Sequence, residues 1–417
     1  MKRFFEIFYE LSSYPRSSGE TAAAREFIRA FCEKRGFPAN SDSAGNLLVT
    51  IKTPKICLQS HYDMVAIGDH PPRVIRDNGY LCAQNGTLGA DNGVGVALML
   101  RLIERQIAGE YLFTNDEEIG LLGAKNLSVI PVSKTLINLD GEEDGAIIIG
   151  CAGGADYTLS EPLEYINAPS GYQPYAISAK NCVGGHSGVD IDKNIRSALV
   201  EASRFCFDRG ALIASIDGGE KKNAISRSVR AIAFFDTAPQ SGEFIDVRPI
   251  KTERKVIKES QKLLQMLVSL PHGVLRRGED GIHASANFAL AKTSANTLTI
   301  SVSARGHSFE ALDEIDRRIC QYKWFSIEKS AEYPPWQNGG GEAAKRTFDI
   351  MKSMKLPARF IVMHAGLECA FLKDKLPNAE LFSIGPEIDF PHSDKERVRI
   401  SSISQFSEVL ERVMGEA

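Results

Sequence analysis

The sequence predicts an α/β fold in which a mostly parallel sheet carries helices on both faces and is interrupted by a smaller α+β domain. Short apolar runs alternate with helical stretches over roughly the first 150 residues, which is the pattern of buried parallel strands joined by helices. From about residue 171 this pattern changes, and near residue 336 it returns. We therefore expect one domain made of residues 1–170 and 336–417, with residues 171–335 inserted into it.

The elements of the first segment follow from local periodicity. Apolar residues recur at i, i+3, i+4 and i+7 from Phe4 and again from Ala24, which predicts two opening helices. Gly36 is placed to end the second helix. Buried strands are then expected at 47–51, 56–58, 111–113, 136–139 and 147–149, with helices at 94–103 and 119–127.

The inserted segment mixes strands with long helices. Strand-like runs are expected at 175–179, 226–235 and 297–304, and helices at 195–206, 256–267 and 312–319. The linker Tyr333-Pro334-Pro335 follows, since consecutive prolines interrupt regular structure. Two further strands, at 360–362 and 381–384, and a final helix with apolar residues from 403 to 413 complete the first domain.

Composition excludes several classes of protein. Apolar residues make up 43% and charged residues 24% of the chain, as in globular proteins and unlike disordered or collagen-like chains. With 49 basic and 53 acidic residues the net charge is −4, without the basic excess of a nucleic-acid binder. No apolar run approaches the ~18 residues of a membrane span, and the acidic Glu6 argues against a signal peptide. The eight cysteines contain no CxxC pair, so the expected compartment is the reducing cytoplasm.

Acidic and histidine side chains follow the predicted strands directly. They come after the runs at 56–58, 111–113, 136–139 and 381–384, and a glycine-rich segment at 86–93 adds another carboxylate where a helix opens. Ligands bind beyond the carboxyl ends of strands in open α/β sheets. A single strand-end carboxylate is usually a solvated loop or a helix cap, but five such residues on one rim indicate a site. The residues are His61, Asp91, Glu118, Asp140 and His392.

These residue types suit two divalent metal ions. Two histidines and three carboxylates can give each ion one histidine and one carboxylate, with a third carboxylate shared. Paired ions in such sites lie ~3.5–4 Å apart and acidify the water between them. Because no thiolate is among the ligands, Zn²⁺, Co²⁺ and Mn²⁺ are all reasonable.

Two short spacings suggest how the site is supported. His61 and Asp63 project to the same side of an extended segment, so Asp63 can hold the second imidazole nitrogen of His61. Glu117 and Glu118 are adjacent and diverge, so one can bind metal while the other acts as general base. A solvated helix start is the alternative for this pair.

Several motifs resemble the zinc metallopeptidase family of aminoacylase, carboxypeptidase G and carnosinase. The family motifs are SHYDMV at 60–65, GADNG at 89–93 and TNDEEIG at 114–120. A narrower resemblance, to the aminoacyl-histidine (Xaa-His) dipeptidases of the peptidase D group, is carried by NLDGEE at 138–143, GCAGG at 150–154, GGHSG at 184–188, HAGLEC at 364–369 and FPHS at 390–393. In the family's order these matches cover nearly the whole chain.

The resemblance implies a role for each matched position. It makes His61, Asp91, Glu118, Asp140 and His392 the metal ligands with Asp91 as the bridge, Glu117 the general base and Asp63 the partner of His61. It also makes residues 171–335 a lid and dimerisation domain, and His186 a lid histidine that polarises the scissile carbonyl. A turn histidine without a catalytic part is the alternative for His186.

The implied activity is that of a metal-dependent dipeptidase acting on Xaa-His-like dipeptides, with two zinc ions and a homodimer formed through the lid. Asn223 and Arg305 are candidates for binding a substrate carboxylate, because a guanidinium offers a bidentate fork, and His364 and Glu368 are candidates for the substrate amine. Ordinary structural roles remain open for these four. An N-acyl-amino-acid amidohydrolase on the same metals is the main alternative. Two other classes of protein are disfavoured. The glycine-rich segment at 86–93 lacks the Gly-Lys-Ser/Thr ending of a phosphate-binding loop. A metal-free binding module would normally have lost a metal ligand or the base, and all of these residues are present here.

Overall fold

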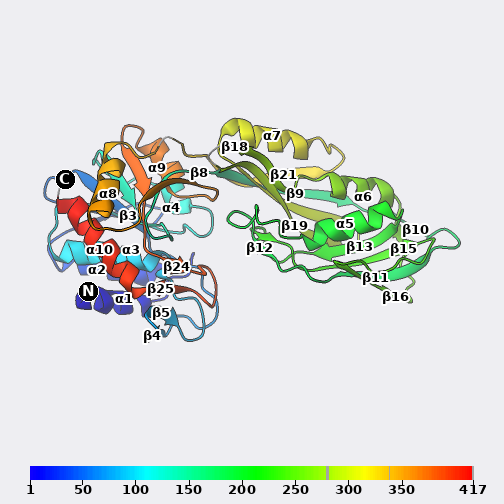
Figure 1. Cartoon of the computed structure of the whole chain (residues 1–417), viewed down its shortest axis with the longest axis horizontal. Coiled ribbons are helices and arrows are strands. Elements are labelled where there is room, and N and C mark those ends of the chain that lie inside the picture. Colours follow the sequence, from blue (N-terminus) through cyan, green and yellow to red (C-terminus); the bar gives the residue numbers. More distant parts are fainter. Residues whose placement is uncertain (279–280, 338, 416–417) are drawn as a thin grey trace. The chain divides into compact units, whose positions relative to one another are not determined.

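The computed structural model describes residues 1–278, 281–337 and 339–415, and the chain divides into two compact units. The first comprises Met1–Cys151, Trp336–Met363 and Leu367–Ala417, and the second comprises Ala152–Pro335 with His364–Gly366. They are blue to cyan with orange to red, and green to yellow, in Figure 1. The first boundary lies earlier than the expected residue 171, because strand β9 (Gly153–Pro162) pairs with two strands of the second unit.

The sheet of the first unit confirms the expected α/β class. Its strand order is β1-β2-β6-β3-β7-β23-β8-β22. The four strands β6, β3, β7 and β23 are parallel neighbours. Strand β2 is antiparallel to both of its neighbours, β1 and β6. Strands β8 and β22 run parallel to each other, and β8 is antiparallel to β23. The bounds are β1 Ala39–Ser41, β2 Leu47–Ile51, β3 Ile56–His61, β6 Gly109–Thr114, β7 Thr135–Asn138, β8 Ala146–Cys151, β22 Arg359–Met363 and β23 Glu380–Ser383.

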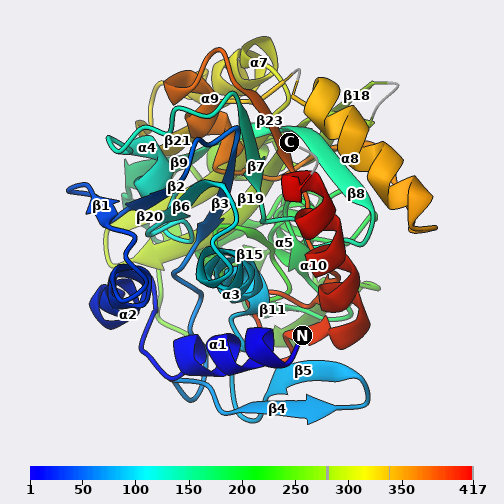
Figure 2. The ribbon, with the colours of Figure 1, turned by 90° about the vertical axis from the view of Figure 1, so that its left-hand side faces the viewer.

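Helices cover both faces of this sheet, because successive strand residues point to opposite sides. Leu136 and Leu381 enter one hydrophobic core, whereas their neighbours Ile137 and Phe382 enter the other. The larger core is closed by α1 (Lys2–Ser12), α2 (Ala22–Glu33), α3 (Ala90–Glu104), α8 (Glu342–Ser353) and α10 (Ile400–Gly415), and the smaller by α4 (Leu122–Lys125) and α9 (Cys369–Lys375) (Figure 2).

Two features of the first unit differ from the sequence expectation. The helix expected at 119–127 is only Leu122–Lys125, because Asp116 and Leu121 adopt left-handed backbone angles in the loop before it. A small antiparallel sheet, in the order β24-β25-β5-β4, was not expected. Its strands are β4 Val74–Asp77, β5 Tyr80–Ala83, β24 Ile388–Asp389 and β25 Arg397–Arg399, and the β24–β25 connection carries His392.

The second unit is an antiparallel sheet with three helices on one face. Its strand order is β16-β11-β15-β13-β19-β20-β9-β21, and β18 also pairs with β19. Its strands are β11 Gln173–Ala179, β13 Leu212–Gly218, β15 Val229–Phe235, β16 Ile245–Pro249, β18 Gly273–Gly278, β19 Gly281–Ser294, β20 Thr297–Gly306 and β21 Ser326–Tyr333. Helices α5 (Ala198–Asp208), α6 (Ser260–Ser269) and α7 (Phe309–Cys320) share one core with the sheet. Two small ribbons, β10 (Tyr165–Ile166) with β17 (Val256–Ile257) and β12 (Gly185–His186) with β14 (Ala224–Ile225), complete this α+β unit.

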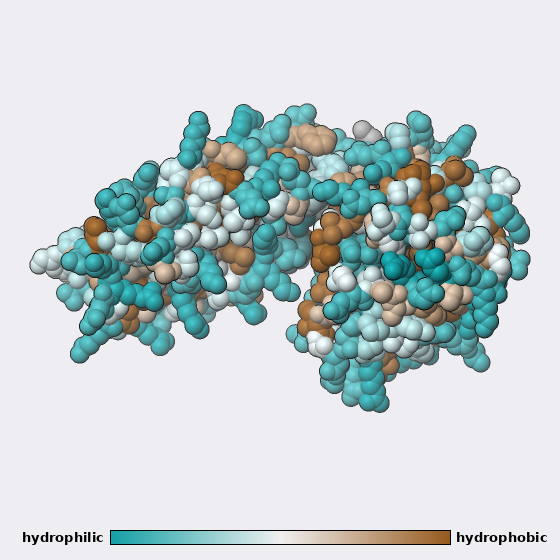
Figure 3. All heavy atoms as spheres, turned by 180° about the vertical axis from the view of Figure 1, so that it is seen from behind, coloured by the Kyte–Doolittle hydropathy of each residue, from teal (hydrophilic) through white to brown (hydrophobic). Residues whose placement is uncertain are grey.

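The surface of each unit is largely polar. On the face drawn in Figure 3, hydrophilic side chains cover most of both units and hydrophobic ones form small separate patches. Among the described residues, no helix combines the length and the hydropathy that crossing a bilayer requires.

Candidate metal centre

Three parallel strands deliver the first residues of the site to one edge of the sheet. His61 is the last residue of β3, the pair Glu117–Glu118 lies in the loop after β6, and Asp140 lies two positions beyond β7. Since β3 is the parallel neighbour of both other strands, their carboxyl ends meet. The ends of these three strands therefore bring His61, the Glu117–Glu118 pair and Asp140 to one edge of the sheet.

Asp91 lies between the two histidines. It stands at the start of α3, where Gly89 has a left-handed φ of 70° and Asp91 itself is not helical. One carboxylate oxygen, Oδ1, lies 3.1 Å from His61 Nε2, and the other, Oδ2, lies 2.9 Å from His392 Nε2. A carboxylate whose oxygens face opposite partners has the geometry of a bridging ligand.

Each histidine is paired with a second carboxylate. His61 Nε2 lies 3.2 Å from Asp140 Oδ1, and His392 Nε2 lies 3.0 Å from Glu118 Oε2. The groups His61–Asp91–Asp140 and Asp91–Glu118–His392 each bring three potential ligand atoms within 4.8 Å of one another, and so does the group His61–Glu117–Glu118. The five expected ligands can therefore hold two metal ions that share Asp91.

The electrostatics of the cluster favour bound cations. Burial and the neighbouring Glu118 raise the pKa of Glu117 well above its ordinary value. Burial alone would lower the pKa of His392, but its hydrogen bonds to Asp91 and Glu118 raise that pKa to about 12. The Oε1 atom of Glu118 is buried and has no hydrogen-bond partner among the described residues. Because unpaired buried charge is costly, this donor set fits divalent cations, which supply the missing positive charge.

Asp63 supports both the ligands and the adjacent glutamates. His61 Nδ1 lies 3.2 Å from the backbone carbonyl of Asp63 and 3.5 Å from its Oδ1, so Asp63 adjoins this imidazole through both groups. The same carboxylate accepts the backbone N–H groups of Glu117 at 3.1 Å and Glu118 at 3.2 Å, and the hydroxyl of Ser18 at 2.8 Å. This second function was not expected from the sequence, and it holds the Glu-Glu pair at the rim as one unit with His61.

The chain matches the family model described as "Peptidase family M20/M25/M40" over residues 57–416, which include every expected metal ligand. The chain belongs to this peptidase family. The cytosol non-specific dipeptidase of Escherichia coli (strain K12) is 27% identical over 484 aligned positions, which cover 99% of this chain and 97% of that protein.

Solved structures of similar proteins agree with this membership. The aminoacylhistidine dipeptidase from Vibrio alginolyticus is similar with a TM-score of 0.80 and 26% identity, over 99% of this chain and 96% of that one. A tripeptidase from Staphylococcus aureus has a TM-score of 0.61 at 18% identity, over 99% and 98% of the two chains, and shares the fold. The family resemblance inferred from the motifs is confirmed.

His186 lies in the second unit of this peptidase. Its Nδ1 accepts the backbone N–H groups of Gly188 and Val189, each at 3.2 Å. In the neutral ring the proton must then be on Nε2, which makes Nε2 a hydrogen-bond donor. Asn223 is close to it, because β12 and β14 pair His186 with Ala224, and the Asn223 carbonyl accepts the N–H of Ser187 at 2.9 Å.

Arg305 and His364 come together elsewhere in the second unit. Arg305 on β20 is opposite Ser285 on β19, and the Ser285 hydroxyl lies 2.7 Å from His364 Nε2. His364 Nδ1 lies 3.1 Å from His307 Nε2, and Arg305 donates to the Tyr333 hydroxyl at 2.8 Å. Burial first, and then His307 and Arg305, lower the pKa of His364 to about 3, so this histidine is neutral at pH 7.

Glu368 belongs to the first unit. Its side chain is completely buried and accepts hydrogen bonds from Gln59 on β3 and from Thr114 on β6. Burial raises its pKa to about 8. These hydrogen bonds tie Glu368 to the two strands β3 and β6 that carry the site. The expected contact with a substrate amine stays a prediction.

Arg16 and Glu396 support the Asp91 loop and were missed by sequence reasoning. Glu396 accepts the N–H of Gly89 at 2.8 Å and that of Asp91 at 3.1 Å. Arg16, which has no exposed surface, donates to the carbonyl groups of Gly89, Tyr62 and Asp63. Burial lowers the pKa of Arg16 only to about 10, so it remains charged at pH 7. The spacing of Glu396 four residues after His392 was a weak signal, and nothing local marked Arg16.

Replacing Glu396 by alanine is expected to destabilise the fold by ~3–5 kcal/mol and to weaken metal binding. The substitution removes the acceptor of two buried N–H groups and also the carboxylate near the buried Arg16 charge. Leaving a buried charge without its counter-charge lowers the free energy of unfolding by about this amount. Glu396→Gln keeps one acceptor oxygen and should lose less. Urea unfolding and metal titration of both variants measure this. As a control, Glu408→Ala removes only the exposed pair with Arg412 and should change little. Wild-type metal affinity in Glu396→Ala would contradict the proposed role of Glu396 in holding the Asp91 loop.

Proposed function

We propose that this chain is a metal-dependent dipeptidase that hydrolyses the peptide bond of dipeptides, those of the Xaa-His type among them. The observation that carries the proposal is Asp91, whose two oxygens face two separate histidine–carboxylate pairs, with Glu117 beside them. The names of the Escherichia coli and Vibrio alginolyticus relatives support the substrate class. A cytoplasmic location belongs to the proposal and rests on the cytosolic relative.

We assign His61 and Asp140 to one metal ion, Glu118 and His392 to the other, and Asp91 to both. Two bound divalent ions, with zinc as the first choice and cobalt or manganese as alternatives, would supply Lewis acidity and make water a nucleophile near neutral pH.

Within this site Glu117 is assigned the proton transfers. Its carboxylate takes a proton from the attacking water and gives it to the leaving amine. Asp63 keeps His61 and the backbone of Glu117 in place, so that the base and the nearest ligand keep a constant geometry.

The second unit is assigned the lid and dimerisation functions. The Nε2–H of His186 is suited to donate a hydrogen bond to the developing oxyanion of the scissile carbonyl. Arg305 and Asn223 are assigned to the substrate carboxylate, since a guanidinium binds carboxylates in bidentate fashion, and His364, as a neutral imidazole, to the peptide or its amine. A homodimer formed through this unit is part of the proposal.

A panel of substrates tests the proposed function. Purified protein loaded with Zn²⁺ is assayed on dipeptides with and without a C-terminal histidine, on tripeptides and on N-acyl amino acids. The proposal expects the highest kcat/KM among the dipeptides. Faster hydrolysis of N-acyl amino acids would instead assign the site to an amidohydrolase, and hydrolysis of tripeptides alone would reject the dipeptidase assignment.

Chelation is expected to abolish this activity, and Zn²⁺, Co²⁺ or Mn²⁺ to restore it. Removing the ions leaves the carboxylates of Asp91, Glu118, Asp140 and Glu117 without the positive charge that their arrangement requires. Elemental analysis should find two ions per chain in the active protein and none after chelation. Full hydrolysis by protein shown to be metal-free would reject the proposal.

A further inference from the structure

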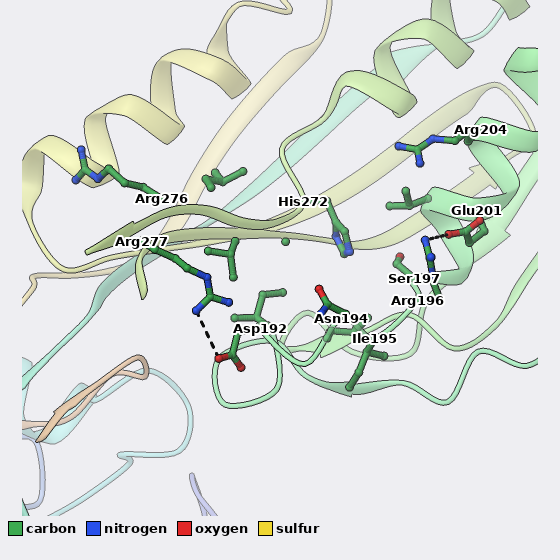
Figure 4. A pocket seen from close by; sticks show the side chains of 16 residues that line it. Asp192, Asn194, Ile195, Arg196, Ser197, Glu201, Arg204, His272, Arg276 and Arg277 are labelled. Atoms are coloured by element: carbon green, nitrogen blue, oxygen red, sulfur yellow. Dashed lines mark hydrogen bonds and ion pairs between the residues drawn. The ribbon is translucent and has the colours of Figure 1, made fainter. Parts of the chain in front are cut away.

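The second unit contains a cavity of about 750 Å³ that lies entirely among its own residues. It is bounded by the loop before α5, by the first turns of α5 and by residues 272–277 at the start of β18 (Figure 4). This volume is within the range of ligand sites, ~300–1,000 Å³. The polar side chains that matter here are Asp192, Asn194, Arg196, Arg204, His272 and Arg277.

His272 presents one hydrogen-bond donor in this cavity. Its Nδ1 accepts the backbone N–H of Phe288 at 3.1 Å, so the proton of the neutral ring is on Nε2. Burial lowers the pKa of His272 to about 4, which keeps the ring neutral and its tautomer constant at pH 7. Within the described part of the chain Nε2 has no hydrogen-bond partner, and Figure 4 shows the ring reaching into the cavity between Arg277 and Ser197.

Two more polar side chains of the cavity lack partners among the described residues. Arg204 on α5 and Asn194 are exposed side chains at the edge of the cavity. Among the described residues, Arg204 makes no ion pair and the amide of Asn194 makes no hydrogen bond, so both are open to a ligand in place of solvent. Groups that can donate hydrogen bonds, one of them charged, thus border one cavity without a protein acceptor. Polar groups from three segments of the chain thus line one concave surface, as in many ligand sites.

The charge of the lining is positive. Four arginines, at positions 196, 204, 276 and 277, stand against the two carboxylates Asp192 and Glu201. Arg196 pairs with Glu201 at 3.3 Å and Arg277 with Asp192 at 3.8 Å, and Arg276 pairs outside the lining with Glu314 at 3.6 Å. Of the four lining arginines, Arg204 is therefore the one without a carboxylate partner among the described residues, and its charge can pair with a bound anion. Apolar side chains, among them Val200 and Leu275, supply surface for a carbon skeleton.

We propose that this cavity is a binding site for a small organic anion, whose carboxylate or phosphate group accepts hydrogen bonds from Arg204, His272 and Asn194. A guanidinium and a neutral N–H donor suit both kinds of anionic group. The site is additional to the metal centre, and every residue that lines it belongs to the second unit.

Calorimetric titration of the metal-loaded enzyme tests the proposal with three probes. Glutarate presents carboxylates, glycerol 3-phosphate presents a phosphate ester, and glycerol is the neutral comparison. We expect one of the two anions, and not glycerol, to bind with a stoichiometry of one at this site. Binding of glutarate would identify the ligand group as a carboxylate, and binding of glycerol 3-phosphate would identify it as a phosphate.

Variants separate this site from anion binding at the metal ions. Arg204→Gln should weaken binding by about tenfold or more, because it removes the charged fork. His272→Asn keeps an acceptor near the position of Nδ1 for the Phe288 N–H but removes the Nε2–H donor, and it should also weaken binding. Arg230→Gln, which changes an exposed arginine of β15 outside the cavity, is the matched control and should bind like the wild type.

Thermal unfolding checks that each variant is folded. If neither anion binds the wild type at concentrations up to about 10 mM, the proposal is rejected. It is also rejected if binding is the same in the wild type, Arg204→Gln and His272→Asn, because the heat would then come from another site, such as the metal ions.

Discussion

Replacing Glu117 by glutamine should lower kcat by ~10²–10⁴ and leave the metal content close to that of the wild type. A positioned general base is worth about this factor, and glutamine cannot accept the proton. The side chain is almost isosteric, and the Glu117 N–H that Asp63 accepts remains, so the loop should keep its conformation. Steady-state kinetics on a dipeptide, with elemental analysis of the same preparation, measures both quantities.

The adjacent glutamate is the matched control. Glu118 Oε2 lies 3.0 Å from His392 Nε2, so Glu118→Gln should lower metal occupancy as well as activity. Added metal should partly restore Glu118→Gln and should not restore Glu117→Gln. The reverse pattern would exchange the assignments of base and ligand.

Replacing His186 by alanine should lower kcat by ~10²–10³, the usual value of one oxyanion donor. Both metals should remain, because His186 is in the second unit and the proposed ligands are in the first. KM should change little if the hydrogen bond forms mainly in the transition state. A large rise in KM with an unchanged kcat would show instead that His186 only binds the substrate.

Subunit mixing tests whether His186 serves its own subunit or that of a partner. Inactive His186→Ala and inactive Glu117→Ala are mixed under conditions of subunit exchange. If the lid histidine acts across a dimer, one hybrid site receives both intact residues and activity returns. If both residues serve one subunit, no hybrid site is complete, so mixing recovers nothing. Mass spectrometry of differently tagged chains verifies that exchange took place.

The sequence was a good guide to the first unit because its signals are local. Short apolar runs predicted the strands, and the structure sends Leu136 and Ile137 of one such run into different cores. The i, i+3, i+4, i+7 repeat from Phe4 predicted a helix, and its apolar face enters the larger core. Parallel strands end at one edge, so a histidine or carboxylate after each strand predicts a shared site without any knowledge of the strand order. That reasoning found His61, Glu118 and Asp140, and the family motifs added the roles.

Local signals failed where distant segments meet. Asp116 and Leu121 have left-handed backbone angles, and the expected helix is shortened there. The boundary between the two units lies before the expected residue 171, because β9 pairs with strands more than 130 residues away. The four-stranded sheet that presents His392 joins residues 74–83 to residues 388–399. Pairing of this kind depends on which edges are left open after the rest of the chain has folded, and no short stretch of sequence encodes it.

By itself, the sequence predicted the α/β class, the family and a set of candidate metal ligands, because each depends on residue type and near-neighbour spacing. The tertiary structure decided how these candidate ligands are arranged around Asp91. It placed one Asp91 oxygen against His61 and the other against His392, and it brought Glu396 and the buried Arg16 to the Asp91 loop from opposite ends of the chain. It also brought Arg204, Asn194 and His272 to one cavity. The physical reason is that hydrogen bonds and ion pairs depend on distances of about 3 Å, which are set by the packing of whole elements and not by spacing along the chain.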